Sequence, residues 1–158
     1  TMTINVTSVN DAPTGTNTLV ATEEDTQYTF STGNFGFGDV SDSPANAFSG
    51  VRIAVLPAAG NLQLNGVNVT AGQYISAANI TSGLLKFVPA AQANGVPYTT
   101  FTFQVQDNGG IANGGVDLDQ SANTITINVT VINDAPTGTD TTVTTNEDVQ
   151  YTFSTGSF

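Results

Sequence analysis

The chain has 158 residues, of which two are basic and thirteen acidic, so its net charge at neutral pH is −11. A surface with so little positive charge repels nucleic acid and anionic lipid, and we expect neither as a partner. No cysteine or histidine is present, which excludes disulfides and removes the ligands that favour zinc or copper. No apolar run approaches the roughly 20 residues that a membrane-spanning helix needs, so membrane insertion is not expected.

The first 35 residues occur a second time at the end of the sequence. Thr1–Phe35 aligns with Thr124–Phe158 at an offset of 123 residues, and 26 of the 35 aligned positions are identical. A period of this length is too long for a solenoid unit and fits one domain. We therefore interpret the chain as one repeat of a tandem array, with parts of neighbouring repeats at both ends.

Apolar and polar residues alternate in short segments along most of the chain. In chain order these segments contain Tyr28 and Phe30, Val51–Val55, Leu62 and Leu64, Leu85–Phe87, Phe101–Asp107 and Thr124–Val131. A period of two, in segments rich in Thr, Val, Ile and Phe, is typical of half-buried antiparallel strands. Asn-Gly and Gly-Asn pairs between them predict turns, and only Ser76–Ile80 is expected to form a helical turn. Seven or more short strands predict an all-β fold, a Greek-key β-sandwich.

The repeat also predicts how the chain is divided. Residues 1–9 are expected to be the last strand of a preceding repeat, and residues 140–158 the first strands of a following one. Residues 10–16 and 132–139 are predicted linkers, since the sequence Asn-Asp-Ala-Pro-Thr-Gly-Thr occurs in both. The complete domain is expected at residues 14–131. The flanking strands have apolar faces that are free to pair with a neighbouring molecule or an open sheet edge.

All thirteen carboxylates are predicted to lie in linkers or in loops between strands. In a sandwich such loops gather at the two ends, where clustered like charges cost free energy unless a cation offsets them. Ca²⁺ binds about six to eight oxygens from carboxylates, amide and backbone carbonyls and water, which this sequence offers. No EF-hand loop or glycine-rich nonapeptide repeat is present, so a calcium site would combine distant segments. The alternative interpretation is that these acids are simply solvated in loops.

Five short segments carry nine of the thirteen acidic residues. They are Val9–Pro13 (VNDAP), Glu23–Thr26 (EEDT), Phe35–Asp42 (FGFGDVSD), Phe101–Gly110 (FTFQVQDNGG) and Gly114–Asp119 (GGVDLD). Together they resemble the cadherin-like tandem repeats of very large bacterial surface adhesins of the RTX type. The resemblance spans the whole 123-residue unit. It implies a β-sandwich of the cadherin or immunoglobulin kind, with calcium at the junctions between repeats stiffening the array.

The same resemblance implies ligands at two junctions. The upstream junction would use Asn10, Asp11, Asp39, Asp42 and Asp107, and the downstream junction Glu24, with Asp25 beside it, Asn133 and Asp134. The chain departs from the family pattern in three places. The paired acids are spaced Asp-x-x-Asp rather than Asp-x-Asp, Ser8 and Val131 replace the first acid of the linker motif, and Pro89–Pro97 carries no acid. These departures imply fewer ions per junction than in animal cadherins.

Asp117 and Asp119 flank the loop between the last two predicted strands. From there they are placed to close on Asp107 and bind an ion within the domain. They are equally placed to be exposed acids on a solvated turn, and both interpretations stand.

No arrangement of residues predicts catalysis. Carboxylate pairs such as Asp39 and Asp42 have no apolar pocket to raise one pKa, and histidine is absent as an alternative base, so we expect no enzyme. The resemblance implies a structural extender of an extracellular adhesin on a bacterial cell surface, whose partners are the neighbouring repeats. The alternative is a calcium-dependent module that binds a glycan or associates with like domains.

Overall fold

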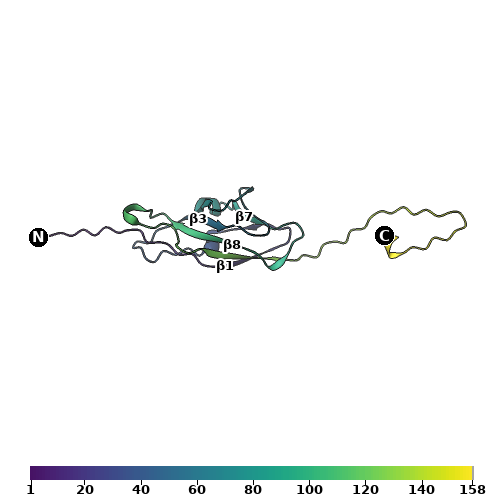
Figure 1. Cartoon of the computed structure of the whole chain (residues 1–158), viewed down its shortest axis with the longest axis horizontal. Helices are drawn as coiled ribbons and strands as arrows, with labels where there is room; N and C mark the ends of the chain where they lie inside the picture. Colours follow the sequence, from purple (N-terminus) through teal and green to yellow (C-terminus); the bar gives the residue numbers. More distant parts are fainter. Residues whose placement is uncertain (158) are drawn as a thin grey trace.

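Two β-sheets pack face to face in the computed structural model, which describes residues 1–157 (Figure 1). One sheet has the order β1 (Thr18–Glu23), β9 (Asn123–Thr130), β8 (Gly95–Asp107), β3 (Phe48–Val55) and β6 (Tyr74–Ser76). The other has the order β2 (Tyr28–Thr29), β7 (Leu85–Val88), β4 (Asn61–Leu64) and β5 (Val67–Asn68). The helical elements are α1 (Ala77–Thr81) and three 3₁₀ turns, η1 (Thr32–Phe35), η2 (Ala112–Gly114) and η3 (Thr155–Ser157). The predicted all-β sandwich is confirmed.

The alternation seen in the sequence decides which side chains each strand buries. In β8, Phe101, Phe103 and Val105 are buried, while Thr102 and Gln104 between them are partly exposed. The helical turn predicted at Ser76–Ile80 is also present, as α1. It begins there because the Ser76 hydroxyl accepts the Asn79 backbone N–H at 3.2 Å, which caps the first turn.

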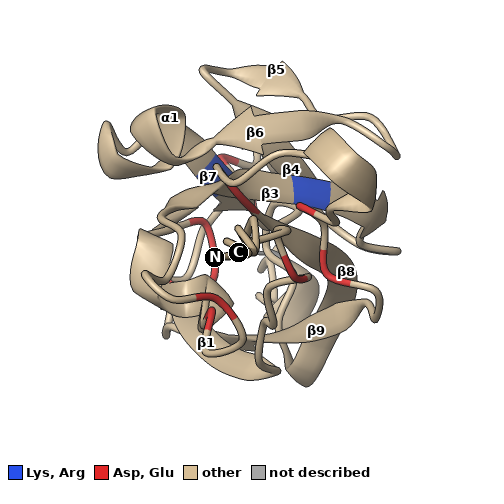
Figure 2. Cartoon of the chain, turned by 90° about the vertical axis from the view of Figure 1, so that its left-hand side faces the viewer, with Lys and Arg blue, Asp and Glu red and all other residues tan. Residues whose placement is uncertain are grey.

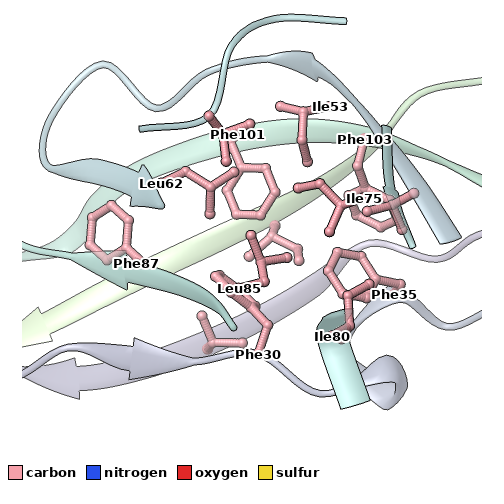
Figure 3. Close-up of a cluster of buried hydrophobic side chains, with 14 of the residues drawn as sticks. Phe30, Phe35, Ile53, Leu62, Ile75, Ile80, Leu85, Phe87, Phe101 and Phe103 are labelled. Atoms are coloured by element: carbon pink, nitrogen blue, oxygen red, sulfur yellow. The ribbon is translucent and has the colours of Figure 1, made fainter. Parts of the chain in front are cut away.

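Aromatic side chains from the first copy of the repeated segment join the two sheets (Figure 3). Phe30 and Phe101 meet edge to face with ring centroids 5.6 Å apart, and Phe35 and Phe103 do so at 4.9 Å. Edge-to-face aromatic pairs contribute about 0.5–1.5 kcal/mol beyond the burial of their area. The segment after β1 is therefore an integral part of the core.

The first and last strands of the sandwich run parallel. β1 pairs with β9 from Thr18 opposite Ile125 to Glu23 opposite Thr130. Because both strands point the same way, the chain enters the sandwich at one end and leaves it at the other (Figure 1). Units of this kind, joined in series, would extend end to end.

The two flanks lie outside both sheets. Residues 1–9 and 131–154 form no strand, and large apolar side chains such as Ile4, Val6, Val143 and Phe153 are exposed there. A strand needs a partner for its backbone N–H and C=O groups, and for these flanks the partner would belong to a neighbouring repeat. Their assignment to neighbouring repeats stays a prediction. Phe158, at the end of the predicted following strands, lies outside the described residues. No helix in the part of the chain that the structure describes has the length and apolar character needed to cross a membrane.

Phe30 and Phe153 occupy equivalent positions of the two copies but differ in burial. Phe30 is 2% exposed in the core, whereas Phe153 is 60% exposed in the C-terminal flank. We predict that Phe30→Ala lowers the free energy of unfolding by about 3–5 kcal/mol, as expected for a buried phenylalanine. Phe153→Ala is the matched control and should change it by less than about 0.5 kcal/mol. Urea unfolding of both variants measures this, and equal losses would contradict the assignment of the core.

Candidate metal centre

Acidic loops gather at the end of the sandwich where the N-terminal flank enters. Figure 2 looks onto this end, with acidic segments in red around the point of entry. The side chains involved are those of Asn10, Asp39, Asp42, Asn46 and Asp107, and Asp11 joins them through its backbone N–H. A cavity of about 230 Å³ opens beside Asn10, Asp42 and Asn46. The end of the domain that receives the linker is therefore both acidic and hollowed.

Asn10 is held by hydrogen bonds on every polar group that its side chain offers. Its Nδ2 donates to Asp107 Oδ1 at 3.1 Å and to the Val116 carbonyl at 2.8 Å. Its Oδ1 accepts from the Asn46 side-chain amide, and its backbone carbonyl accepts the Val116 N–H at 2.9 Å. Asn10 is thus anchored to the domain that follows it.

Two glycines make room for the Asn10 side chain. A Cβ atom on Gly109 would lie 1.9 Å from Asn10 Oδ1, and one on Gly115 would lie 3.1 Å from Asn10 Cβ. Any other residue at Gly109 would occupy the space that Asn10 fills. We call this space, bounded by Asp107, Val116, Asn46 and the two glycines, the asparagine socket.

Asp107 closes the β8 strand at the bottom of the socket and is only 2% exposed. Burial raises the pKa of the Asp107 carboxyl above its ordinary value, while hydrogen bonds from the Gly109 N–H and the Asn10 side chain lower it. The nearby charges of Asp39 and Asp117 raise this pKa further. Asp107 therefore lies among negative charges that favour a compensating proton or cation.

Asp39 has an unsatisfied oxygen in the same region. The residue is 8% exposed, its Oδ2 accepts the Asn46 backbone N–H, and its buried Oδ1 has no hydrogen-bond partner. Leaving such a buried acceptor unpaired costs about 1–3 kcal/mol, and more when the group is charged. Asp42 is better supplied, because its Oδ2 accepts the Asp11 N–H at 3.0 Å and the Asn46 amide at 3.1 Å. A cation beside Asp39 would remove this cost.

The donor set fits calcium by chemistry, since it consists of carboxylate, amide and backbone oxygens. The structure brings Asn10, Asp42 and Asp107, three of the residues named for the upstream junction, into one hydrogen-bonded network with Asp39. In this network amide N–H groups lie between the carboxylates. As a result, no three acidic side chains of residues 1–157 come close enough together to form a ready-made metal site. Calcium binding would require Asn10 and Asn46 to present their oxygens instead.

Asp119, unlike Asp39, has hydrogen-bond donors on both of its carboxylate oxygens. Its Oδ2 accepts the Gly15 N–H at 2.9 Å and the Asn123 amide at 2.7 Å, and its Oδ1 accepts from the N–H and hydroxyl of Ser121 at 2.9 and 3.1 Å. The predicted solvated turn is wrong for this residue, because Asp119 is buried. Its four hydrogen bonds tie the start of the domain to β9. The Asp117 side chain accepts one hydrogen bond, from Gln106 at 2.9 Å, while its backbone carbonyl accepts the Asp107 N–H at 2.9 Å and its charge acts on the Asp107 carboxyl.

The acids predicted for the downstream junction, Glu24 and Asp25, accept hydrogen bonds from N–H groups of the protein. Glu24 Oε1 accepts the Ile132 N–H at 2.7 Å, and its Oε2 accepts from the Asn94 side chain at 3.1 Å. Both oxygens of Asp25 accept from Gln92, at 2.9 Å from its backbone and 2.8 Å from its side chain. The structure does not bring Asn133 and Asp134 to Glu24. Both are exposed, and Asn133 donates to the Asp134 carbonyl at 3.4 Å.

Sequence reasoning missed the amide residues that complete these clusters. Asn46, Gln92 and Asn94 donate to predicted acids from loops that carry no recognisable motif. Gly109 and Gly115 stood in the segments that carry the resemblance but had no predicted role in the site, although each borders the asparagine socket. Comparisons of the chain with models of protein families, with characterised proteins and with solved structures found no match.

We predict that Asp107→Asn changes how stability depends on pH. The pKa of this carboxyl is raised in the folded state and ordinary in the unfolded state, so between the two values the folded chain binds more protons. The stability that Asp107 contributes therefore falls as pH rises through this window and is lost above the folded pKa. Asparagine removes the charge, so Tm of the variant minus Tm of the wild type should increase with pH. Thermal melts in chelator from about pH 3.5 to 7.5 test this, and a difference that shrinks with rising pH would contradict it.

Asp119→Ala should lower the free energy of unfolding by about 3 kcal/mol or more, because it removes the buried, charged acceptor of four part-buried hydrogen bonds. The loss should be the same in calcium and in chelator. Asp117→Ala, which removes a single hydrogen bond, is the matched control and should cost less than about 1 kcal/mol. If the Asp119→Ala loss appeared only in calcium, Asp119 would be a metal ligand rather than a structural residue.

Proposed function

We propose that this domain is a spacer unit of an extracellular, bacterial cell-surface adhesin, repeated in tandem and stiffened by calcium where successive units meet. The observation that carries the proposal is the buried, unpaired Oδ1 of Asp39, beside Asp107 and at the point where the linker enters. A carboxylate oxygen in such a place favours a cation.

The architecture supports an extending role. Parallel pairing of β1 with β9 places the entry and exit of the chain at opposite ends, so each added unit lengthens the array. The second copy of the first 35 residues supplies the start of a following unit. A negative surface with two basic residues also limits contacts with anionic cell envelopes and nucleic acid.

Calcium would supply positive charge among the acids at the entry end, held by Asp39, Asp42 and Asp107 with amide oxygens of Asn10 and Asn46. These residues connect the linker to two different loops of the domain, the one between η1 and β3 and the one that begins at Asp107. Removing their mutual repulsion would therefore stabilise both the loops and the angle at which the linker enters. Extracellular modules bind calcium with dissociation constants on the order of 10⁻⁴–10⁻³ M, which matches the concentrations outside cells.

Calcium titration of the 158-residue chain, by calorimetry and by thermal melts, tests the proposal. We predict that about 10 mM calcium stabilises the fold by about 1–3 kcal/mol relative to chelator, from the linkage relation with these dissociation constants. Asp39→Asn should abolish the gain. Asp140→Asn removes the same charge from the exposed C-terminal flank and should leave the gain unchanged.

A chain with two complete units, made by adding residues 36–131 after Phe158, tests the extending role. Small-angle scattering should give an elongated particle in calcium and a wider range of dimensions in chelator. Absence of calcium stabilisation in both chains would contradict the calcium part of the proposal. Compact, side-by-side packing of the two units would contradict the spacer role.

A further inference from the structure

We propose that successive repeats are joined without a free linker residue, because two consecutive residues are held by hydrogen bonds to two different repeats. Ile132 is held by Glu24 of the repeat that it leaves. Asn133, the equivalent of Asn10, fits the asparagine socket of the repeat that it enters. The surface involved is the socket, and its partner is the Asn-Asp-Ala-Pro segment that ends a neighbouring copy. This junction goes beyond the proposed function, since it requires no cation.

The exit side of the domain holds the chain through Ile132. Glu24 directly follows β1, and its backbone N–H donates to the Thr130 carbonyl at 2.9 Å, continuing the pairing of β1 with β9. The buried Glu24 carboxylate then accepts the Ile132 N–H at 2.7 Å. Asn94 donates to its second oxygen and fixes its orientation. The chain is therefore not released from the domain at the end of β9 but two residues later.

The entry side holds the chain from Asn10 onward. Besides the Asn10 bonds in the socket, the Asp11 N–H donates to Asp42, and Thr14 and Gly38 exchange two backbone hydrogen bonds of 2.8 Å. The Gly15 N–H then donates to Asp119. The segment predicted from sequence to be a linker, residues 10–16, is thus docked along its length on the domain that follows it.

The internal repeat joins these two observations. With the offset of 123 residues, Ile132 corresponds to Val9 and Asn133 to Asn10, and residues 133–139 are identical to residues 10–16. A following repeat with the same socket would therefore hold Asn133 as this one holds Asn10. The hydrogen bonds from the two repeats would then hold adjacent residues, Ile132 and Asn133. Because the peptide bond between them is planar, the angle between repeats could change mainly through φ and ψ of Ile132 and φ of Asn133.

Glu24 has a different role here from the one that the family resemblance implies. As a calcium ligand, its carboxylate would have to be open to an ion. Instead, both oxygens accept N–H donors from Ile132 and Asn94. We therefore assign to Glu24 the role of holding Ile132 where the chain leaves the domain. Calcium would then add to a junction whose geometry hydrogen bonds already set.

Amide hydrogen exchange of the 158-residue chain in chelator tests this role of Glu24. The Ile132 amide should exchange at least about tenfold more slowly than the exposed amide of Asp134, because its N–H is bound to a buried carboxylate. Glu24→Ala should remove this protection. Glu23→Ala, which alters the adjacent exposed acid, should not. An Ile132 amide that exchanges at the rate of Asp134 in the wild type would overturn the proposal.

The socket is tested with a matched pair of substitutions in the same motif. Asn10→Asp places a negative charge against Asp107 and should lower Tm in chelator by several degrees. Asn133→Asp makes the same change at an exposed position and should leave Tm of this chain unchanged. In the two-unit chain, the Asn133 side-chain amide should become as protected from exchange as that of Asn10. Equal Tm values for all three chains, or an Asn133 amide that stays unprotected, would overturn the proposal.

Calcium separates this junction from the proposed function. If the chain fails to bind calcium but Ile132 and Asn133 are protected in chelator, the hydrogen-bonded junction holds and the calcium proposal fails. If protection appears only when calcium is added, the calcium proposal holds and the metal-free junction is overturned.

Discussion

The parallel pairing of β1 with β9 is the constraint on which the rest of this structure depends. It closes the five-stranded sheet by joining the start of the domain to its end. It also brings Glu24 beside the residues that follow β9, and Gly15 beside the Asp119 loop that precedes it. Because the two strands point the same way, entry and exit lie at opposite ends. The lengthwise stacking proposed for the repeats depends on this one pairing.

Two buried carboxylates at the entry end show how surroundings decide the role of an acid. Asp119 accepts four hydrogen bonds, so its charge is compensated by protein groups and it acts as a structural anchor. Asp39 is buried to a similar degree but leaves one oxygen unpaired. Both lie in segments of similar acidic composition. The difference arises from the number of N–H donors that distant loops bring to each side chain.

Surroundings also decide whether each copy of the repeated segment forms a strand. Thr18–Glu23 is a strand because β9 pairs with it, and Phe30 is buried because β8 lies across from it. The corresponding residues after 140 have nearly the same sequence, yet they form no strand and remain exposed. Local sequence thus supplies the capacity to form a strand, and the partner sheet supplies the free energy.

Local patterns in the sequence determined the elements of this protein. Alternating residues in Phe101–Asp107 predicted β8, Ser76 predicted the helical turn, and Asn65-Gly66 predicted the turn between β4 and β5, where both residues have positive φ. The acids of the entry end could also be grouped from the sequence, through a resemblance. Only the tertiary structure decided that residues 10–16 dock on the domain, that Glu24 holds Ile132, and that Asn46 and Asn94 donate to the acids. Strand and turn preferences act between near neighbours, whereas these hydrogen bonds join groups up to 108 residues apart, whose proximity depends on how the sheets close.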